Sequence, residues 1–250
     1  MEAYATASQV YAAGLVFARI GAMVMLVPGL GDASVPPRVR LSFALLMAFI
    51  LTPLVAPSLP VPDAVSGVAA AVIRETLIGL MIGAILRLMM SALATAGEVI
   101  SIQTTLGFAQ TANPMQAQPS ATLSTFISLI GVTLIMTTDL HHLFFGAMVR
   151  SFEIFPFTRA LPVGDSVTLA VQTMASSFAL GIQLSAPVIV FSVVFNLASG
   201  LVGRVMPQFQ IFFVASPLAV IFGLSIFALS LGVIGMVFTT RYRELLQVFS

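Results

Sequence analysis

The chain has 250 residues, of which 59% are hydrophobic and 8% charged, and its formal net charge is +1 at pH 7. Soluble domains carry about 25% charged residues, so this composition excludes a self-contained soluble fold and predicts an all-α integral membrane protein. The small net charge gives no reason to expect nucleic-acid binding. The absence of Cys and Lys excludes disulfides, thiolate metal sites, a P-loop lysine and Schiff-base chemistry.

Two apolar segments begin the chain and are separated by helix-breaking residues. The first covers residues 3–27, with Arg19 inside it, and is followed by the proline-containing stretch 28–37. The second covers residues 41–52 and is followed by Pro53. A helix of that length spans ~18 Å, which is short of the ~30 Å hydrocarbon core of a bilayer. We therefore expect this helix either to continue through a kink at Pro53 or not to span lipid.

A long helix is predicted over residues 66–105, and small residues recur along it. They are spaced as Gly79-x-x-x-Gly83 and Ala92-x-x-x-Ala96-Gly97. This spacing lets helix backbones approach closely in membranes. Packing within the chain and contact with partner subunits explain the stripe equally well.

The same helix carries four charged residues, Arg74, Glu75, Arg87 and Glu98. Arg87 and Glu98 are three helical turns apart, so they share a face at about 16 Å, too far to pair directly. Ionisable residues inside a membrane are functional candidates by default. We favour charges that lie near helix ends and reach the interface, or that pair with other subunits, over a proton relay.

An uncharged polar segment, residues 107–120, lies between two apolar stretches and contains two prolines, three glutamines and one asparagine. A loop that faces water normally carries charge. Irregular backbone cannot face lipid, because each unpaired N–H or C=O group is costly there. We therefore expect the segment to be buried in protein or to line an aqueous path, which makes it the best candidate for the working part of the molecule.

The second half predicts a helix over residues 121–138, a polar end at Asp139-Leu-His-His142 and a shorter helix to residue 152. Uncharged runs follow at 166–203 and 205–240, each ~55 Å long if straight and helical. We expect two helices that meet at a turn over 203–208 and are kinked at Pro187 and Pro217. Helices matched so poorly to a bilayer are expected to pack against protein neighbours.

Residues with catalytic or metal-binding chemistry are few. Asp139, His141 and His142 could hold a metal, but adjacent histidines are expected to point to different faces of a helix, and the chain has no other histidine. A polar helix end is therefore the favoured interpretation. No GxSxG, SxxK or paired-carboxylate motif occurs, so we expect no metal, no cofactor and no enzymatic activity.

Three groups of motif residues follow one another along nearly the whole chain, and the last is the most specific. They are Phe17-Ala-Arg-Ile-Gly21, Pro28, Val35, Pro36 and Arg40; Gly97-Glu-Val-Ile100, Gln103, Gly107-Phe-Ala109, Asn113, Pro114, Phe155 and Pro156; and Ser185-Ala-Pro187, Asn196-Leu-Ala-Ser-Gly200-Leu-Val-Gly203-Arg204, Pro207, Gln208, Phe213, Pro217 and Leu218. Together they resemble the FliR family, the flagellar member of the type III protein export gate, whose injectisome counterpart is the SctT family. Asp139 and His141 depart from the family, which usually has Asn and Gly at these places.

The resemblance implies an export-gate subunit in the bacterial inner membrane at the base of the flagellum. Kinked helical hairpins would pack with FliP-type and FliQ-type subunits into a right-handed helical assembly. FlhB-type and FlhA-type export proteins would be further partners, and unfolded flagellar proteins would be the cargo. Within one FliR-type domain of residues 1–250, residues 1–165 would be the FliP-like portion and 166–250 the FliQ-like hairpin.

The resemblance also implies a plug loop that closes the channel. On this sequence it falls on Leu106, Gly107, Phe108, Gln110, Asn113, Pro114, Met115, Gln116, Gln118 and Pro119. An uncharged polar plug suits a channel for unfolded polypeptide, because it can pack against apolar walls without burying a charge. Partner contacts or packing are expected at Gly79, Gly83, Arg87, Glu98, Gly203, Arg204, Pro207 and Gln208.

Two other functions fit parts of the pattern. A secondary transporter would use Arg87, Glu98 and Asp139 as a charge pathway and would work as a lone chain or a homodimer. A passive scaffold would have no role in a conduit. Arg38 and Arg40 favour a cytoplasmic first connection, and arginines 241 and 243 favour a cytoplasmic C-terminus.

Overall fold

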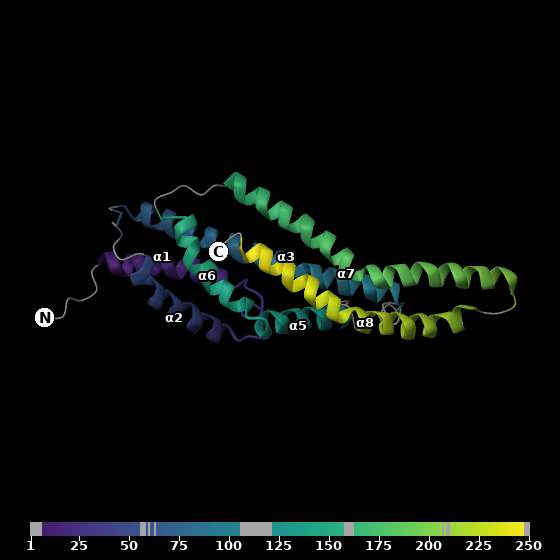
Figure 1. The fold of residues 1–250 in the computed structure, drawn as a ribbon. Helices are drawn as coiled ribbons and strands as arrows, with labels where there is room; N and C mark the ends of the chain where they lie inside the picture. The colour runs from purple at the N-terminus through teal and green to yellow at the C-terminus, as the bar shows by residue number, and fades with distance from the viewer. Residues whose placement is uncertain are drawn as a thin grey trace, which may run out of the picture. The chain divides into compact units, whose positions relative to one another are not determined.

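The described residues of the computed structural model are 7–55, 59, 61, 62, 64–105, 122–157, 163–206, 208 and 211–247. Helix is the only regular secondary structure within these ranges (Figure 1). The helices are α1 (Ala7–Val24), α2 (Pro37–Val55), α3 (Val65–Gln103), α5 (Thr122–Thr137), α6 (Leu140–Ile154), α7 (Val163–Val205) and α8 (Ile211–Gln247). The prediction of an all-α fold is confirmed.

Five helices in the described part of the chain are long and apolar enough to cross a membrane, namely α1, α2, α3, α7 and α8. Helices α5 and α6 together pass the same test, but they are bent by 75° at the break between them. Length and apolar composition therefore make the chain an all-α integral membrane protein.

Helix α2 is longer than the sequence indicated. It begins at Pro37 and runs through Pro53 to Val55, and its 19 residues make ~28 Å of helix, close to the thickness of a bilayer core. Pro37 is well suited to the first helical position, because its fixed φ matches the helix and the N–H of that position has no helical partner. The expected start at residue 41 was wrong, and of the two alternatives the helix continues through Pro53.

Three helices exceed the thickness of a bilayer core. α3 has 39 residues, α7 has 43 and α8 has 37, which correspond to ~58, ~64 and ~55 Å. Helical structure passes through Pro187 in α7 and Pro217 in α8. The mismatch of these helices to a bilayer is confirmed, while kinks at the two prolines stay a prediction.

The chain divides into two compact units. The first combines Met1–Met89, Asp139–Met174 and Arg243–Ser250, and in it α1 packs against α2. The second combines Met90–Thr138 and Ala175–Tyr242. In it α7 and α8 form a hairpin (Figure 1). The rings of Phe191 on α7 and Phe222 on α8 lie against each other, with centroids 6.4 Å apart. The division into a FliP-like and a FliQ-like portion at residue 165 stays a prediction.

The corner between α5 and α6 depends on one residue in a left-handed backbone conformation. Asp139 has φ 58° and ψ 15° and precedes the first residue of α6. Aspartate is one of the few non-glycine residues found repeatedly in this region. The backbone N–H of His142 donates to the carbonyl of Asp139 at 3.1 Å. The predicted helix end at 139–142 is confirmed, and it is also the start of the next helix.

Candidate functional site

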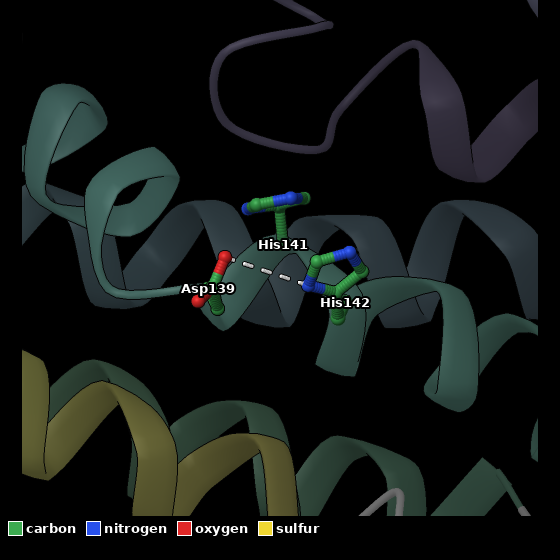
Figure 2. A group of neighbouring side chains, drawn as sticks. All are labelled: Asp139, His141 and His142. Carbon is green, nitrogen blue, oxygen red and sulfur yellow. Dashed lines mark ion pairs between the residues drawn. The ribbon is translucent and has the colours of Figure 1, made fainter.

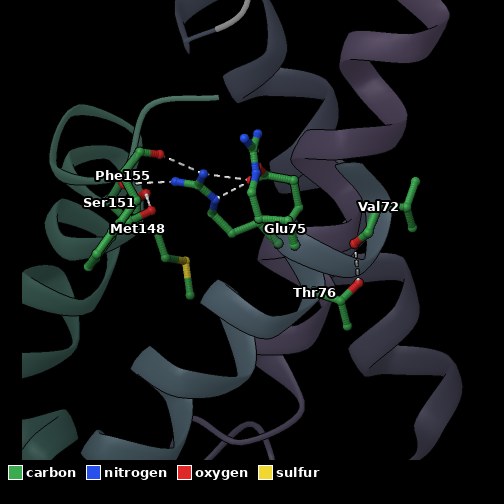
Figure 3. A network of polar contacts seen from close by, with 8 residues as sticks. Val72, Glu75, Thr76, Met148, Ser151 and Phe155 are labelled. Atoms are coloured by element: carbon green, nitrogen blue, oxygen red, sulfur yellow. Dashed lines mark hydrogen bonds and ion pairs between the residues drawn. The ribbon is translucent and has the colours of Figure 1, made fainter. Parts of the chain in front are cut away.

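A buried arginine joins three helices of the first unit. The side chains of Arg19 on α1 and Glu75 on α3 are fully buried, and Nε and Nη2 of Arg19 both lie 2.6 Å from Oε2 of Glu75. Nη1 donates to the backbone carbonyl of Ser151 and Nη2 to that of Phe155, each at 2.7 Å (Figure 3). These carbonyls lie at the C-terminal end of α6, where the helix dipole favours a cation, and the Ser151 carbonyl also accepts from the backbone N–H of Phe155 at 3.0 Å.

Glu75 lies between two guanidinium groups. Its Oε1 accepts from Nε and Nη2 of Arg74 at 3.2 and 2.8 Å, and the Arg74 side chain is 23% exposed. The Arg19 guanidinium carbon also lies 4.2 Å from the ring centroid of Phe152, a cation–π geometry. The buried charges are thus paired and hydrogen-bonded, which is what burial of an ion pair requires if it is not to destabilise the fold.

Two glycines bring α3 close to α1 beside this ion pair. A Cβ atom on Gly79, one turn after Glu75, would collide with the carbonyl oxygen of Arg19 and the side chain of Ala22. A Cβ atom on Gly83 would lie 2.8 Å from Cβ of Leu26. Packing within the chain therefore accounts for both glycines, and a role for them in partner contacts stays a prediction.

The second half of the small-residue stripe packs inside the second unit. Ala92 and Ala96 are fully buried, and a Cβ atom on Gly97 would collide with the backbone of Ser124 on α5. The Ser124 hydroxyl donates to the carbonyl of Ala94 at 3.0 Å. Helix α3 thus packs closely against α5 at Gly97, six residues before the end of α3.

The end of α3 in the second unit combines side-chain hydrogen bonds with backbone strain. The Ser192 hydroxyl on α7 donates to Oε1 of Gln103 at 2.9 Å, and Nδ2 of Asn196 donates to the Ser192 hydroxyl at 3.2 Å. Thr105 has φ 57°, which is unfavourable for a β-branched residue. Its hydroxyl is buried without a hydrogen-bond partner among the described residues. The predicted plug begins at the next residue, and residues 106–120 lie outside the described part of the chain.

Charged and polar residues predicted to contact partners lie on the surface of their units. Arg87 and Glu98 on α3 are exposed, and no hydrogen bond or ion pair is found for either within the described residues. Glu98 lies five residues before the end of α3, but Arg87 lies near its middle. A position near a helix end therefore fits Glu98 and was wrong for Arg87.

The C-terminal partner residues lie around the end of α7. Arg204 and Gln208 are exposed and Gly203 is half-buried, while Pro207 lies outside the described residues. The end of the α7–α8 hairpin also holds an apolar pocket of about 340 Å³, lined in part by Phe195 and Val202 of α7 and Leu218 of α8. An open apolar pocket of this size marks a surface that contacts lipid or protein partners.

Asp139, His141 and His142 lie together at the corner between α5 and α6 (Figure 2). One ligand atom from each lies within 4.8 Å of the others, and Nδ1 of His142 is 3.7 Å from Oδ1 of Asp139. The two imidazole centroids are only 4.1 Å apart. The expectation that adjacent histidines would point apart was therefore wrong, because the helix begins at this corner and does not separate their side chains.

Sequence reasoning missed the Arg19–Glu75 pair and the Gln103–Ser192 bond. The residues of the first are 56 positions apart and those of the second 89, so local spacing could not reveal them. One signal was present: Arg19 is the only charged residue of its apolar segment, and a charge in such a segment needs a partner of opposite sign.

Comparison with known proteins places these features in a family. A profile of the family described as "Bacterial export proteins, family 1" matches residues 10–245. The Flagellar biosynthetic protein FliR of Caulobacter vibrioides is 64% identical, with all of each chain covered. The chain belongs to the FliR family. The proteins of the same name from Escherichia coli and Aquifex aeolicus are each 30% identical, covering 84% and 94% of this chain and 80% and 91% of theirs.

Membership identifies this FliR-family chain as a flagellar biosynthetic protein of a bacterial export family, embedded in a membrane by the apolar helices described above. The family match spans residues 10–245, and so it includes the ion pair at Arg19, the corner at Asp139 and the segment 106–120.

Proposed function

We propose that this chain is a subunit of the flagellar type III export gate in the bacterial inner membrane. It forms part of the channel for unfolded flagellar proteins, together with FliP-type and FliQ-type subunits, and works with FlhB-type and FlhA-type export proteins. The observation that carries the proposal is the match to an export-protein family over residues 10–245. The exposed apolar surfaces of α2 and of the α7–α8 hairpin are open to partner subunits as well as to lipid, so they are compatible with an assembly.

Residues 106–120 are the plug of this channel in the proposal. The segment is polar, uncharged and rich in glutamine and proline, and such backbone cannot face hydrocarbon. It follows Thr105, whose left-handed backbone is the kind of strain that gathers at functional segments. On the other side α5 is held against α3 by the contact of Gly97 with Ser124, so both ends of the segment leave from packed helices.

The plug is tested by replacing residues 110–118 with a Gly-Ser linker of equal length in cells and in the purified assembly. We expect higher ion conductance through the resting gate, because the side chains that fill the channel are gone, and altered export of flagellar proteins. A Gly-Ser replacement of residues 158–162 is the matched control and should leave conductance at the wild-type level. Wild-type conductance and export with the 110–118 replacement would remove the plug from the proposal.

The secondary transporter makes a different prediction, and a second measurement separates it from the gate. Neutralising Glu98 would abolish transport by the lone chain if that residue belonged to a charge pathway. The gate predicts instead that the full chain becomes stable in detergent when it is produced together with FliP-type and FliQ-type subunits. A lone chain that is stable, monodisperse and active in transport would contradict the gate.

A further inference from the structure

We propose that the corner between α5 and α6 binds a divalent transition-metal ion of the Zn²⁺ type through Asp139, His141 and His142. One donor atom from each of the three side chains lies within 4.8 Å of the others (Figure 2). This replaces the expectation from the sequence that the corner holds no metal. The proposal does not depend on the plug, since its residues all belong to the first compact unit.

The donor set selects the class of ion. Two imidazoles and one carboxylate are a ligand combination that suits Zn²⁺ and its neighbours and disfavours Mg²⁺ and Ca²⁺, which take oxygen ligands. In a tetrahedral site with metal–ligand distances of about 2.0–2.2 Å the donor atoms are roughly 3.4 Å apart. The donor atoms, which lie within 4.8 Å of one another, must therefore approach by up to about 1.4 Å. The side chains of His142 and Asp139 are 67% and 77% exposed, so they can move to close it.

His141 is the fixed ligand of the three. Its ring packs edge-on against Phe145, with centroids 6.4 Å apart, and Phe145 in turn contacts Phe43 of α2 at 6.1 Å. Nδ1 of His141 is buried and has no hydrogen-bond partner among the described residues. A buried polar nitrogen without a partner is unfavourable, and coordination of the metal by this Nδ1 atom would relieve the cost.

The carboxylate of Asp139 is also available. Asp139 occupies the N-cap position of α6, yet its side chain makes no capping hydrogen bond, which is the usual role of an aspartate there. The left-handed backbone at Asp139 turns the chain so that its carboxylate lies beside His142. All three ligands come from the four consecutive residues 139–142, so a bound ion would hold the backbone of this turn in place.

The test is Zn²⁺ titration of the full chain in detergent by calorimetry, with Co²⁺ absorption as a spectroscopic probe. The affinity tag must not contain histidine. The chain has no Cys and no His outside this cluster, so binding that depends on imidazole reports this site alone. We expect saturable binding of one Zn²⁺ per chain, no competition by Mg²⁺, and a Zn²⁺-dependent rise of the Tm.

Four variants decide the outcome. His142→Gln and Asp139→Asn should each weaken Zn²⁺ binding by roughly tenfold or more, since even loss of an outer-shell partner costs that much. Asn is chosen at position 139 because it tolerates the positive φ of this residue as aspartate does. Glu153→Gln, on the same helix and 76% exposed, is the matched control and should bind as the wild type does. Absence of saturable Zn²⁺ binding to the wild type would overturn the proposal, and so would an unchanged isotherm in the His141→Gln/His142→Gln double variant.

Discussion

Replacing Glu75 with Gln tests whether the buried ion pair holds the first unit together. The substitution keeps the shape of the side chain but removes the charge that faces Arg19 and Arg74. Arg74 is 23% exposed and can turn to water, whereas the Arg19 side chain is fully buried and cannot. A charge left unpaired in this way costs about 3–5 kcal/mol. For a chain of this length that corresponds to a fall in Tm of roughly 6–20 °C.

Thermal unfolding of the purified full chain at a fixed scan rate measures this effect. Arg74→Gln is the matched control: it removes an arginine that contacts the same carboxylate but is partly hydrated, and we expect a loss of less than about 1 kcal/mol. The double variant Arg19→Met/Glu75→Gln should be more stable than Glu75→Gln alone, because no unpaired cation stays buried. If Glu75→Gln changed the Tm no more than Arg74→Gln does, the ion pair would not be the element that stabilises this unit.

Three further substitutions test the close packing and the strain described above. Gly79→Ala should destabilise the chain by about 1–3 kcal/mol, because its Cβ atom meets the backbone oxygen of Arg19. Gly14→Ala is the control: a Cβ atom there meets nothing within 4 Å, so the substitution should stabilise α1 by about 0.5–1 kcal/mol. Equal Tm values for the two variants would contradict the packing of α3 on α1. Thr105→Gly should raise the Tm, because glycine adopts a positive φ without steric penalty; a lower Tm would show that the left-handed backbone at this position is not a source of strain.

The sequence predicted the helices well and the contacts between them poorly, and the reasons are physical. Long uncharged runs indicated α7 and α8, because a long apolar helix satisfies all its backbone groups within one segment in lipid, whereas membrane strands are about 9–11 residues long. The start of α2 was misplaced, because Pro37 was interpreted as a breaker although proline is favoured at the first helical position. The partner of Arg19 was missed, because pairing across 56 residues depends on how α1 and α3 pack and leaves no local pattern.

The corner at Asp139 shows the same division between local and tertiary information. Its helix end was predicted correctly from the polar residues 139–142, which is a local property. The meeting of the two imidazoles was not, because the prediction treated both histidines as members of a regular helix. Their placement depends on the left-handed backbone at Asp139 and on the packing of Phe145 against Phe43, and neither follows from the spacing of the residues.

Arg87 gives an independent physical reason against a bundle in which lipid surrounds the middle of α3. It is exposed on its unit and lies three residues from the midpoint of α3, or ~5 Å along the helix axis. If α3 were centred in a bilayer and surrounded by lipid, Arg87 would lie near the midplane, where an arginine costs about 2.5–3.5 kcal/mol even on the most lenient scale. The cost disappears if protein partners or water cover this part of α3, or if the helix of ~58 Å extends out of the hydrocarbon. Protein partners around Arg87 would suit the proposed gate and water would suit a charge pathway, whereas lipid around Arg87 at the midplane suits neither.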